Sequence, residues 1–123
     1  MRRPERLAEV LREEIMEIVG YELEDPRLLG CTVTDVVVAE NLRDAKVFVL
    51  VQGAEPEIKE AMKALQHAAT FVKQQVAQNL NLHHAPTLHF VRDTVEENAA
   101  RVERLLGEIG QGENLEKEEM EKG

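Results

Sequence analysis

The side chains of this chain that are best suited to chemistry gather in one stretch, residues 61–92. It holds every histidine of the chain and three further bases: His67, His83, His84, His89, Lys63, Lys73 and Arg92. The same stretch contains no Asp or Glu, although the chain has 24 acidic residues among 123. A segment that excludes negative charge suits contact with a polyanion, so we expect it to face a nucleic acid.

Catalytic and metal-binding interpretations of these residues are weaker. His83 and His84 are adjacent and cannot both reach one metal ion from a regular element, and the stretch offers no carboxylate ligand. The chain has no serine and no glycine-rich phosphate loop, and its one cysteine, Cys31, lacks an obvious base. An enzyme using His84 and Asp93 rests on sequence proximity only. We therefore expect no catalytic residues, no metal and no cofactor.

Composition favours one compact domain followed by a tail. Hydrophobic residues make up 43% of the chain, which supports a core, and no apolar run is long enough to span a bilayer. We expect a cytoplasmic monomer without a membrane contact. The net charge of −9 argues against a nucleic-acid partner, but residues 94–123 hold nine acids against four bases, so much of the excess lies near the C-terminus. The predicted division is a folded domain over residues 1–109 and a disordered acidic tail over residues 110–123.

The N-terminal pattern predicts a helix and then a turn. Pro4 suits a first helical position, apolar residues recur at three- and four-residue steps up to Val19, and Gly20 should end the helix. Asp25 and Pro26 then have the chemistry of a turn.

Two β-branched runs, residues 32–39 and 46–52, predict a hairpin. The alternation of residues favours one core face, which comprises Thr32, Thr34, Val36, Val38, Val47, Val49 and Val51. This choice places Phe48 and Leu50 on the outward face.

A long helix should follow from Pro56 to the helix-ending residues Asn79 and Asn81. Its apolar stripe repeats at steps of three and four without a break, and periodicity alone predicts no kink. The opposite face gathers bases and amides: Lys59, Lys63, Gln66, His67, Thr70, Lys73 and Gln74. A strand over residues 87–91 and a last helix, opened by a capping box of Thr94 and Glu97, complete the expected elements.

Several spaced motifs carry a resemblance to a known family. They are LEDPRL at residues 23–28, TVTDV at 32–36, NLRDAKVFV at 41–49, ALQHAATFVK at 64–73, LHHAPTLHF at 82–90 and DTVEE at 93–97. Together they resemble bacterial ribosome-binding factor A over residues 5–109. The resemblance implies an α+β, type II KH-like domain of order helix, strand, strand, helix, kink, helix, strand, with a C-terminal helix and the acidic tail.

The resemblance also implies a function. The family binds the small ribosomal subunit and its RNA in late maturation and precursor rRNA processing, with a role in cold adaptation and no catalysis of its own. It breaks the long helix with an Ala-x-Gly turn, and here that position reads Ala68-Ala69-Thr70, without the glycine. His83 and His84 replace the arginines usual for the family, so binding should be weaker or more dependent on pH.

These considerations give one set of candidate RNA contacts: Lys63, His67, Ala68, Ala69, Thr70, Lys73, Arg27, Arg43, Lys46, His83 and His84. Arg27 has an alternative role, which is to anchor its own turn. A second hypothesis for the whole chain is a ferredoxin-like protein-interaction or self-association module that binds no RNA. The acidic balance and the outward Phe48 and Leu50 favour it.

Overall fold

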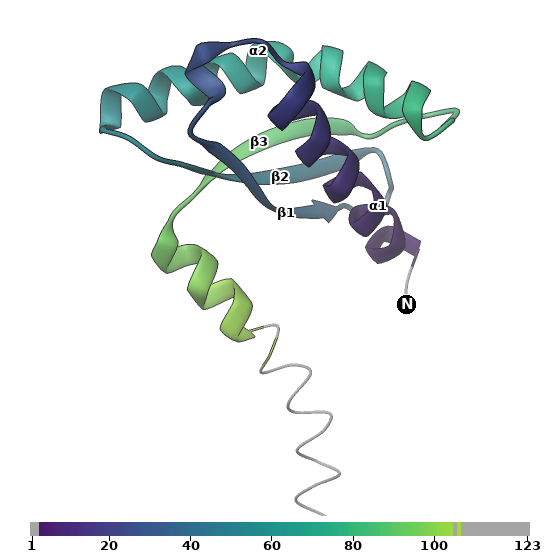
Figure 1. The fold of residues 1–123 in the computed structure, drawn as a ribbon. Coiled ribbons are helices and arrows are strands. Elements are labelled where there is room, and N and C mark those ends of the chain that lie inside the picture. The colour runs from purple at the N-terminus through teal and green to yellow at the C-terminus, as the bar shows by residue number, and fades with distance from the viewer. Residues whose placement is uncertain (1–2, 105, 107–123) are drawn as a thin grey trace, which may run out of the picture. The chain divides into compact units, whose positions relative to one another are not determined.

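The computed structural model describes residues 3–104 and residue 106. They fall into two compact units, Met1–Asp93 and Thr94–Gly123. In the first unit the elements run helix, strand, strand, helix, strand, and Figure 1 shows both helices over a three-stranded sheet. This is the order of the predicted α+β, type II KH-like domain, except that one continuous helix stands where the prediction has a helix, a kink and a second helix.

The first helix, α1, spans Arg3–Glu17 and buries Leu11 and Ile15. The predicted end at Gly20 is wrong, because the backbone continues as a π-helix, Ile18–Glu22, in which the N–H of Leu23 donates to the carbonyl of Ile18 at 3.0 Å. Ile18 and Val19 are both buried although they are neighbours in sequence. The wider π turn extends the apolar stripe of α1 so that both side chains enter the core.

The predicted turn at Asp25 and Pro26 is confirmed. A short 3-10 helix spans Pro26–Leu28, and the carboxylate of Asp25 accepts a hydrogen bond from the backbone N–H of Arg27 at 3.0 Å. Leu28 is buried beneath the turn and joins the core.

The predicted hairpin is present as β1, Cys31–Val38, and β2, Asp44–Val51, which pair antiparallel. The last strand, β3, spans Thr87–Asp93 and pairs parallel to β2, so the strand order is β1-β2-β3. Parallel neighbours need a crossover connection, and the second helix supplies it.

The predicted core face of β1 is partly wrong. Val36 and Val38 are buried as expected, but Thr32 is exposed, Thr34 is only half-buried, and Val33 is buried instead. The cause is a β-bulge between Val33 and Asp35, which reverses the alternation of faces along the strand. On β2, Val47 and Val49 are buried and Phe48 lies on the other face, half-buried, as expected.

The second helix, α2, runs without interruption over Glu55–Asn79. The helical assignment passes through Ala68, Ala69 and Thr70, so the break implied by the resemblance is absent at this position, in agreement with the periodicity. The helix ends as expected: Asn81 adopts a left-handed φ of 53°, and the N–H of Leu82 donates to the carbonyl of Ala77 at 2.9 Å.

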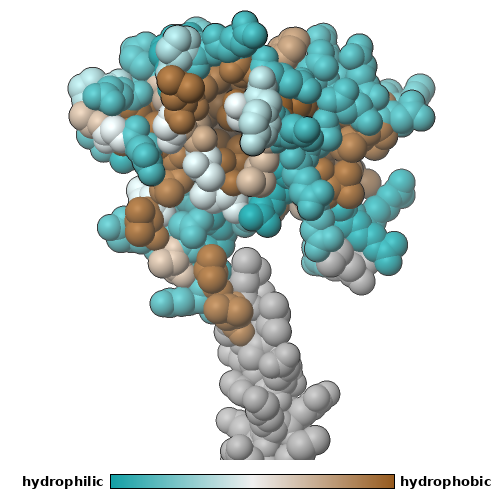
Figure 2. Space-filling model, in the orientation of Figure 1, coloured by the Kyte–Doolittle hydropathy of each residue, from teal (hydrophilic) through white to brown (hydrophobic). Residues whose placement is uncertain are grey.

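One core cluster joins both helices to the same face of the sheet. Its members from the strands are Val33, Val36, Val38, Ala45, Val47, Val49, Leu88 and Phe90, and its members from the helices include Leu11, Ile15, Leu65, Val72 and Val76. Figure 2 shows hydrophilic side chains over much of the side facing the viewer, with apolar ones surfacing in smaller patches.

The second unit begins with the predicted helix start. The hydroxyl of Thr94 accepts a hydrogen bond from the N–H of Glu97 at 3.0 Å, and residues 95–104 are helical. The apolar stripe of this helix is not buried, since Val95, Val102 and Leu106 are 68%, 45% and 62% exposed. The predicted boundary between the folded domain and the tail, after residue 109, lies outside the described residues. No helix in the described part of the chain has the length and hydropathy that a membrane crossing requires.

Candidate nucleic-acid interface

The outward face of α2 exposes side chains of the acid-free stretch and of Lys59, which precedes it. Its exposed bases and uncharged side chains are Lys59, Lys63, Gln66, His67, Thr70, Phe71, Gln74 and Gln78; we call these residues the α2 surface. The buried residues of the same helix, among them Leu65, Val72 and Val76, hold it on the core. A rigid helix therefore presents bases, amides and one aromatic ring along a single face.

Acidic residues from outside residues 61–92 lie close to some of the bases of this stretch. Lys63 Nζ lies 3.7 Å from Glu60 Oε1, and Glu60 Oε2 lies 3.9 Å from Arg27 Nη1. Arg92 is held by Glu55, with nitrogen–oxygen distances of 2.9 and 3.1 Å. Carboxylates from just outside the stretch thus neutralise bases at the N-terminal end of α2.

Arg27 forms a two-pronged ion pair with Asp25. Its Nη2 and Nε atoms lie 2.7 and 3.1 Å from the carboxylate oxygens. These hydrogen bonds lower the pKa of Asp25 and raise that of Arg27. The alternative role predicted for Arg27, anchoring of its own turn, is confirmed, and contact with phosphate stays a prediction.

Lys73 and Gln66 lie at the edge of the α2 surface, on the side that faces β3. Lys73 Nζ donates to Thr87 Oγ1 at 3.4 Å, and Gln66 Oε1 accepts from the backbone N–H of Phe90 at 3.4 Å. The N–H of Thr87 in turn donates to the carbonyl of Arg43 at 2.8 Å. These bonds place Arg43 and Lys73, which are distant in sequence, on either side of Thr87.

The motif at Ala68, Ala69 and Thr70 is divided between core and surface. Ala69 is only 8% exposed and belongs to the core cluster, as the predicted apolar stripe of the helix requires, so its side chain faces the core and its contact with RNA stays a prediction. Ala68 is half-buried and Thr70 is exposed. The α-helical period carries Ala69 inward, and Thr70 alone has an exposed side chain.

His83 and His84 lie in the loop between α2 and β3. Both are exposed, and their rings meet edge to face with centroids 4.5 Å apart. The structure does not support a catalytic pair of His84 and Asp93. His84 precedes β3, whereas Asp93 ends that strand, is buried, and lies 2.7 Å from Thr34 Oγ1. Within the ranges that the structure describes, no group of three His, Cys, Asp or Glu could hold a metal ion.

Lys46 is separated from the other predicted contacts. It is exposed on the sheet face opposite the helices, where it pairs in register with Val37 and His89. His89 Nε2 lies 3.0 Å from Asp44 Oδ1, and this bond lowers the pKa of Asp44. Lys46 therefore lies outside the α2 surface.

Phe71 is an exposed aromatic residue of the α2 surface that the sequence analysis left out of the candidate contacts. It is 43% exposed on α2, one helical turn after His67. The only aromatic residue on the outer face of the strands, Phe48, is half-buried. The helical angle of Phe71, close to that of His67, was the available signal.

The chain is similar to the members of a known protein family. The family model described as ribosome-binding factor A matches residues 3–106. The chain is 47% identical over 109 residues to a ribosome-binding factor A of Thermomicrobium roseum, covering 89% of this chain and 84% of the relative. It is 42% identical to one of Desulfitobacterium hafniense, covering 90% and 89%.

Solved structures agree. The crystal structure of ribosome-binding factor A from Thermus thermophilus is similar, with a TM-score of 0.65 and 25% identity over 74% of this chain and 97% of that one. A Thermus thermophilus homology model fitted into the cryo-EM map of a 30S–RbfA complex has a TM-score of 0.54 and 28% identity, covering 72% and 89%. By sequence and by its KH-like fold, this chain belongs to the ribosome-binding factor A family.

Proposed function

We propose that this protein binds the small ribosomal subunit during late maturation and contacts its RNA with the α2 surface. The observation that carries the proposal is the outward face of α2 from Lys63 to Gln78, which holds Lys63, His67 and Phe71 and no carboxylate. The 30S complex of the Thermus thermophilus relative supports the choice of partner.

The chemistry of the α2 surface suits the backbone and shape of RNA. Lysines and histidines meet phosphates, amides donate to sugar and base oxygens, and Phe71 offers a face for stacking. The chain lacks the row of exposed strand aromatics that a base-reading sheet uses. A protein of this kind acts by binding one conformation of an rRNA segment more tightly than another, which raises the population of that conformation. This is the role we propose in maturation and precursor processing.

Co-sedimentation with immature and mature small subunits tests the proposal. The double variant Lys63→Glu, Lys73→Glu should lose binding to immature subunits and keep the circular dichroism spectrum of the wild type. Since about three to six bases would meet phosphates, the slope of log affinity against log salt should be about −2 to −4.

A matched control separates the α2 surface from net charge. Arg6→Glu with Arg12→Glu makes the same change of charge on α1, at two exposed positions. It should keep most of the binding. Equal losses for the two double variants, or wild-type binding by Lys63→Glu, Lys73→Glu, would remove the α2 surface from the proposal.

The self-association hypothesis has one observation in its favour. Val37 is 48% exposed on the outer sheet face, beside a hollow of about 410 Å³ that Ala39, Lys46 and His89 also line. Sedimentation velocity distinguishes the two functions. A stable dimer that ignores small subunits would favour self-association, whereas we expect a monomer that co-sediments with them.

A further inference from the structure

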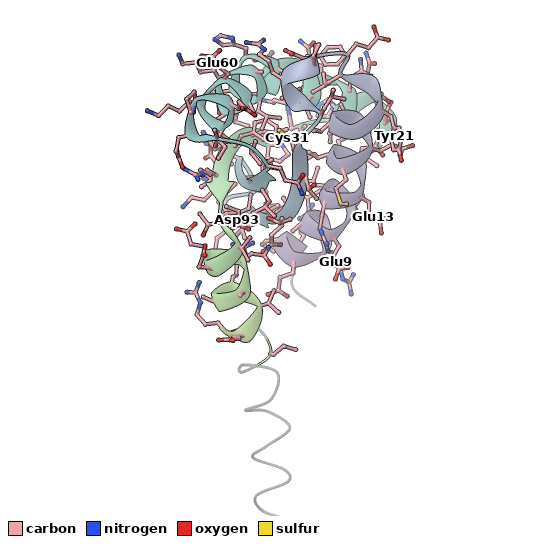
Figure 3. All side chains as sticks on the ribbon, turned by 60° about the vertical axis from the view of Figure 1, so that its left-hand side comes forward. Glu9, Glu13, Tyr21, Cys31, Glu60 and Asp93 are labelled. Carbon is pink, nitrogen blue, oxygen red and sulfur yellow. The ribbon has the colours of Figure 1, made fainter. Side chains whose placement is uncertain are left out.

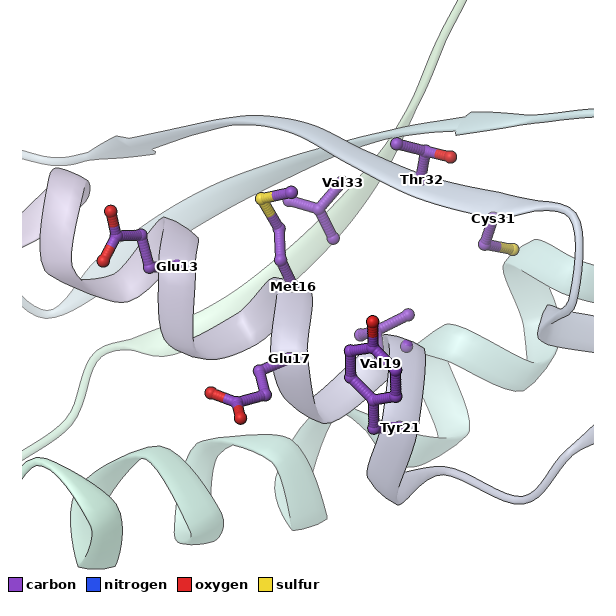
Figure 4. A pocket seen from close by; sticks show the side chains of 9 residues that line it. Glu13, Met16, Glu17, Val19, Tyr21, Cys31, Thr32 and Val33 are labelled. Carbon is purple, nitrogen blue, oxygen red and sulfur yellow. The ribbon is translucent and has the colours of Figure 1, made fainter.

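A groove lies between α1 and β1, apart from the α2 surface. It has a volume of about 520 Å³, within the range of about 300–1,000 Å³ typical of ligand pockets. Figure 4 shows Met16 reaching from the helix toward Val33 on β1, with Tyr21 and Cys31 at one end and Glu13 on the helix side. Its floor is apolar and its helical rim is acidic.

Two side chains of the groove are exposed to an unusual degree for their type. Tyr21 is 85% exposed and Met16 is 39% exposed, whereas Val19 and Val33 beneath them are buried. Tyr21 belongs to the π-helix Ile18–Glu22, and segments of this kind are frequent at functional sites. Exposed Tyr and Met are the residues that protein interfaces use as anchors.

The rim carries charges that disfavour the helix itself. Glu13 and Glu17 line the groove, Glu9 precedes them on α1 at the same four-residue step, and like charges at this spacing destabilise a helix. None of the three takes part in an ion pair with a described residue, although Arg6 and Arg12 lie on the same helix. Figure 3 shows Glu9 and Glu13 along one side of α1. A cation bound here would relieve this repulsion.

We propose that this groove binds a basic peptide segment of a partner protein, one in which lysine or arginine stands beside an apolar residue. The apolar residue and the aliphatic stem of the base pack on Met16 and Val33, and the cationic head reaches Glu13 and Glu17. Tyr21 offers a ring face to the same cation.

The acidic rim of the groove favours a basic peptide over RNA or a second copy of this chain. Phosphates of RNA would be repelled by the glutamates on the rim. A second copy of this chain carries a net charge of −9 and would meet similar repulsion. The inference goes beyond the proposed function and does not depend on RNA binding by α2.

Cys31 provides a site-specific reporter, because it is the only cysteine of the chain and lines the groove. Its burial raises the pKa of the thiol, so alkylation by iodoacetamide is followed at alkaline pH, where part of the thiol is ionised. The probe is a synthetic peptide that repeats Arg-Leu-Lys, added to the full chain. At about ten times its Kd, measured by fluorescence anisotropy, it should slow alkylation about tenfold.

Charge-reversal variants separate the groove from general attraction to an acidic protein. Glu13→Lys with Glu17→Lys should weaken the peptide about tenfold, since two ion pairs become repulsive. Glu96→Lys with Glu103→Lys makes the same change at exposed positions of the second unit and should have a much smaller effect. A Gly-Lys repeat peptide of equal charge should bind more weakly because it lacks the apolar residue.

Three results would overturn the proposal. They are a failure of the Arg-Leu-Lys peptide to slow alkylation, equal weakening by the two double variants, and protection of Cys31 by an rRNA fragment in place of the peptide. Loss of small-subunit binding by the α2 variants leaves the proposal untouched, because those variants keep the groove.

Discussion

The two long helices lie on the same sheet face and share one core, yet their outward faces differ in charge. The α2 surface has three bases, and no carboxylate follows Glu60 on this helix, whereas the groove side of α1 has Glu9, Glu13 and Glu17. In Figure 3, Glu60 marks α2 and Glu13 marks α1. Burial constrains only the inward stripe of each helix, so the outward residues are available for function, and here they suit partners of opposite charge.

The largest effect should come from the inward stripes, where the helices are alike. Leu65→Ala on α2 and Ile15→Ala on α1 each remove a fully buried side chain and should each cost about 2–5 kcal/mol of unfolding free energy. Urea denaturation measures both. A loss of unfolding free energy below about 1 kcal/mol for one variant would mean that its helix is not part of the shared core. The two helices would then not be equivalent in how they are held on the sheet.

An intermediate effect should come from reversing the charge of α1. Replacing Glu9, Glu13 and Glu17 by lysine should raise the affinity for small-subunit RNA about two- to fivefold at low salt, because general repulsion falls. If α1 faces away from RNA, the slope of log affinity against log salt stays unchanged. A slope that steepens by about one for each new lysine would place α1 on the phosphates and end the distinction between the helices.

The smallest effect should come from Glu60, the acid that lies between Lys63 and Arg27. Glu60→Gln should strengthen RNA binding about twofold, because exposed ion pairs are worth only about 0.2–1 kcal/mol. Glu9→Gln removes the same charge from α1 and serves as the control in filter-binding titrations. Weaker binding by Glu60→Gln would indicate that the acid positions these bases for RNA and does not compete with it.

Much of the fold was predictable, since local patterns produce it. The apolar stripe of α2, the turn chemistry of Asp25 and Pro26, and the hydrogen bond from Glu97 to Thr94 are properties of short segments. The wrong predictions also concern short segments, but contacts with distant parts of the chain cause them. Thr34 lies in the bulge of β1, and its hydroxyl meets Asp93, 59 residues later, a partner that no pattern within β1 encodes.

The sequence predicted the kind of side chains in the candidate site better than it predicted which residues are exposed there. The absence of acids from residues 61–92 predicted a helix face that carries bases, and Lys63 and His67 are exposed on that face. It could not show that Ala69 turns into the core, that Lys46 lies on the opposite sheet face, or that Phe71 is exposed.

The sequence by itself determined which residues form helices and strands, which stripe of each helix is apolar, and where carboxylates are excluded. These follow from backbone propensity and from the helical and strand periods of about 3.6 and about 2 residues. Only the tertiary structure decided that Glu60 lies between Arg27 and Lys63, that Lys73 meets Thr87, and that Tyr21 and Met16 line a groove against β1. Most of these contacts join different elements of the fold, and the register of the strands and the packing of the helices fix them only when the whole core has formed.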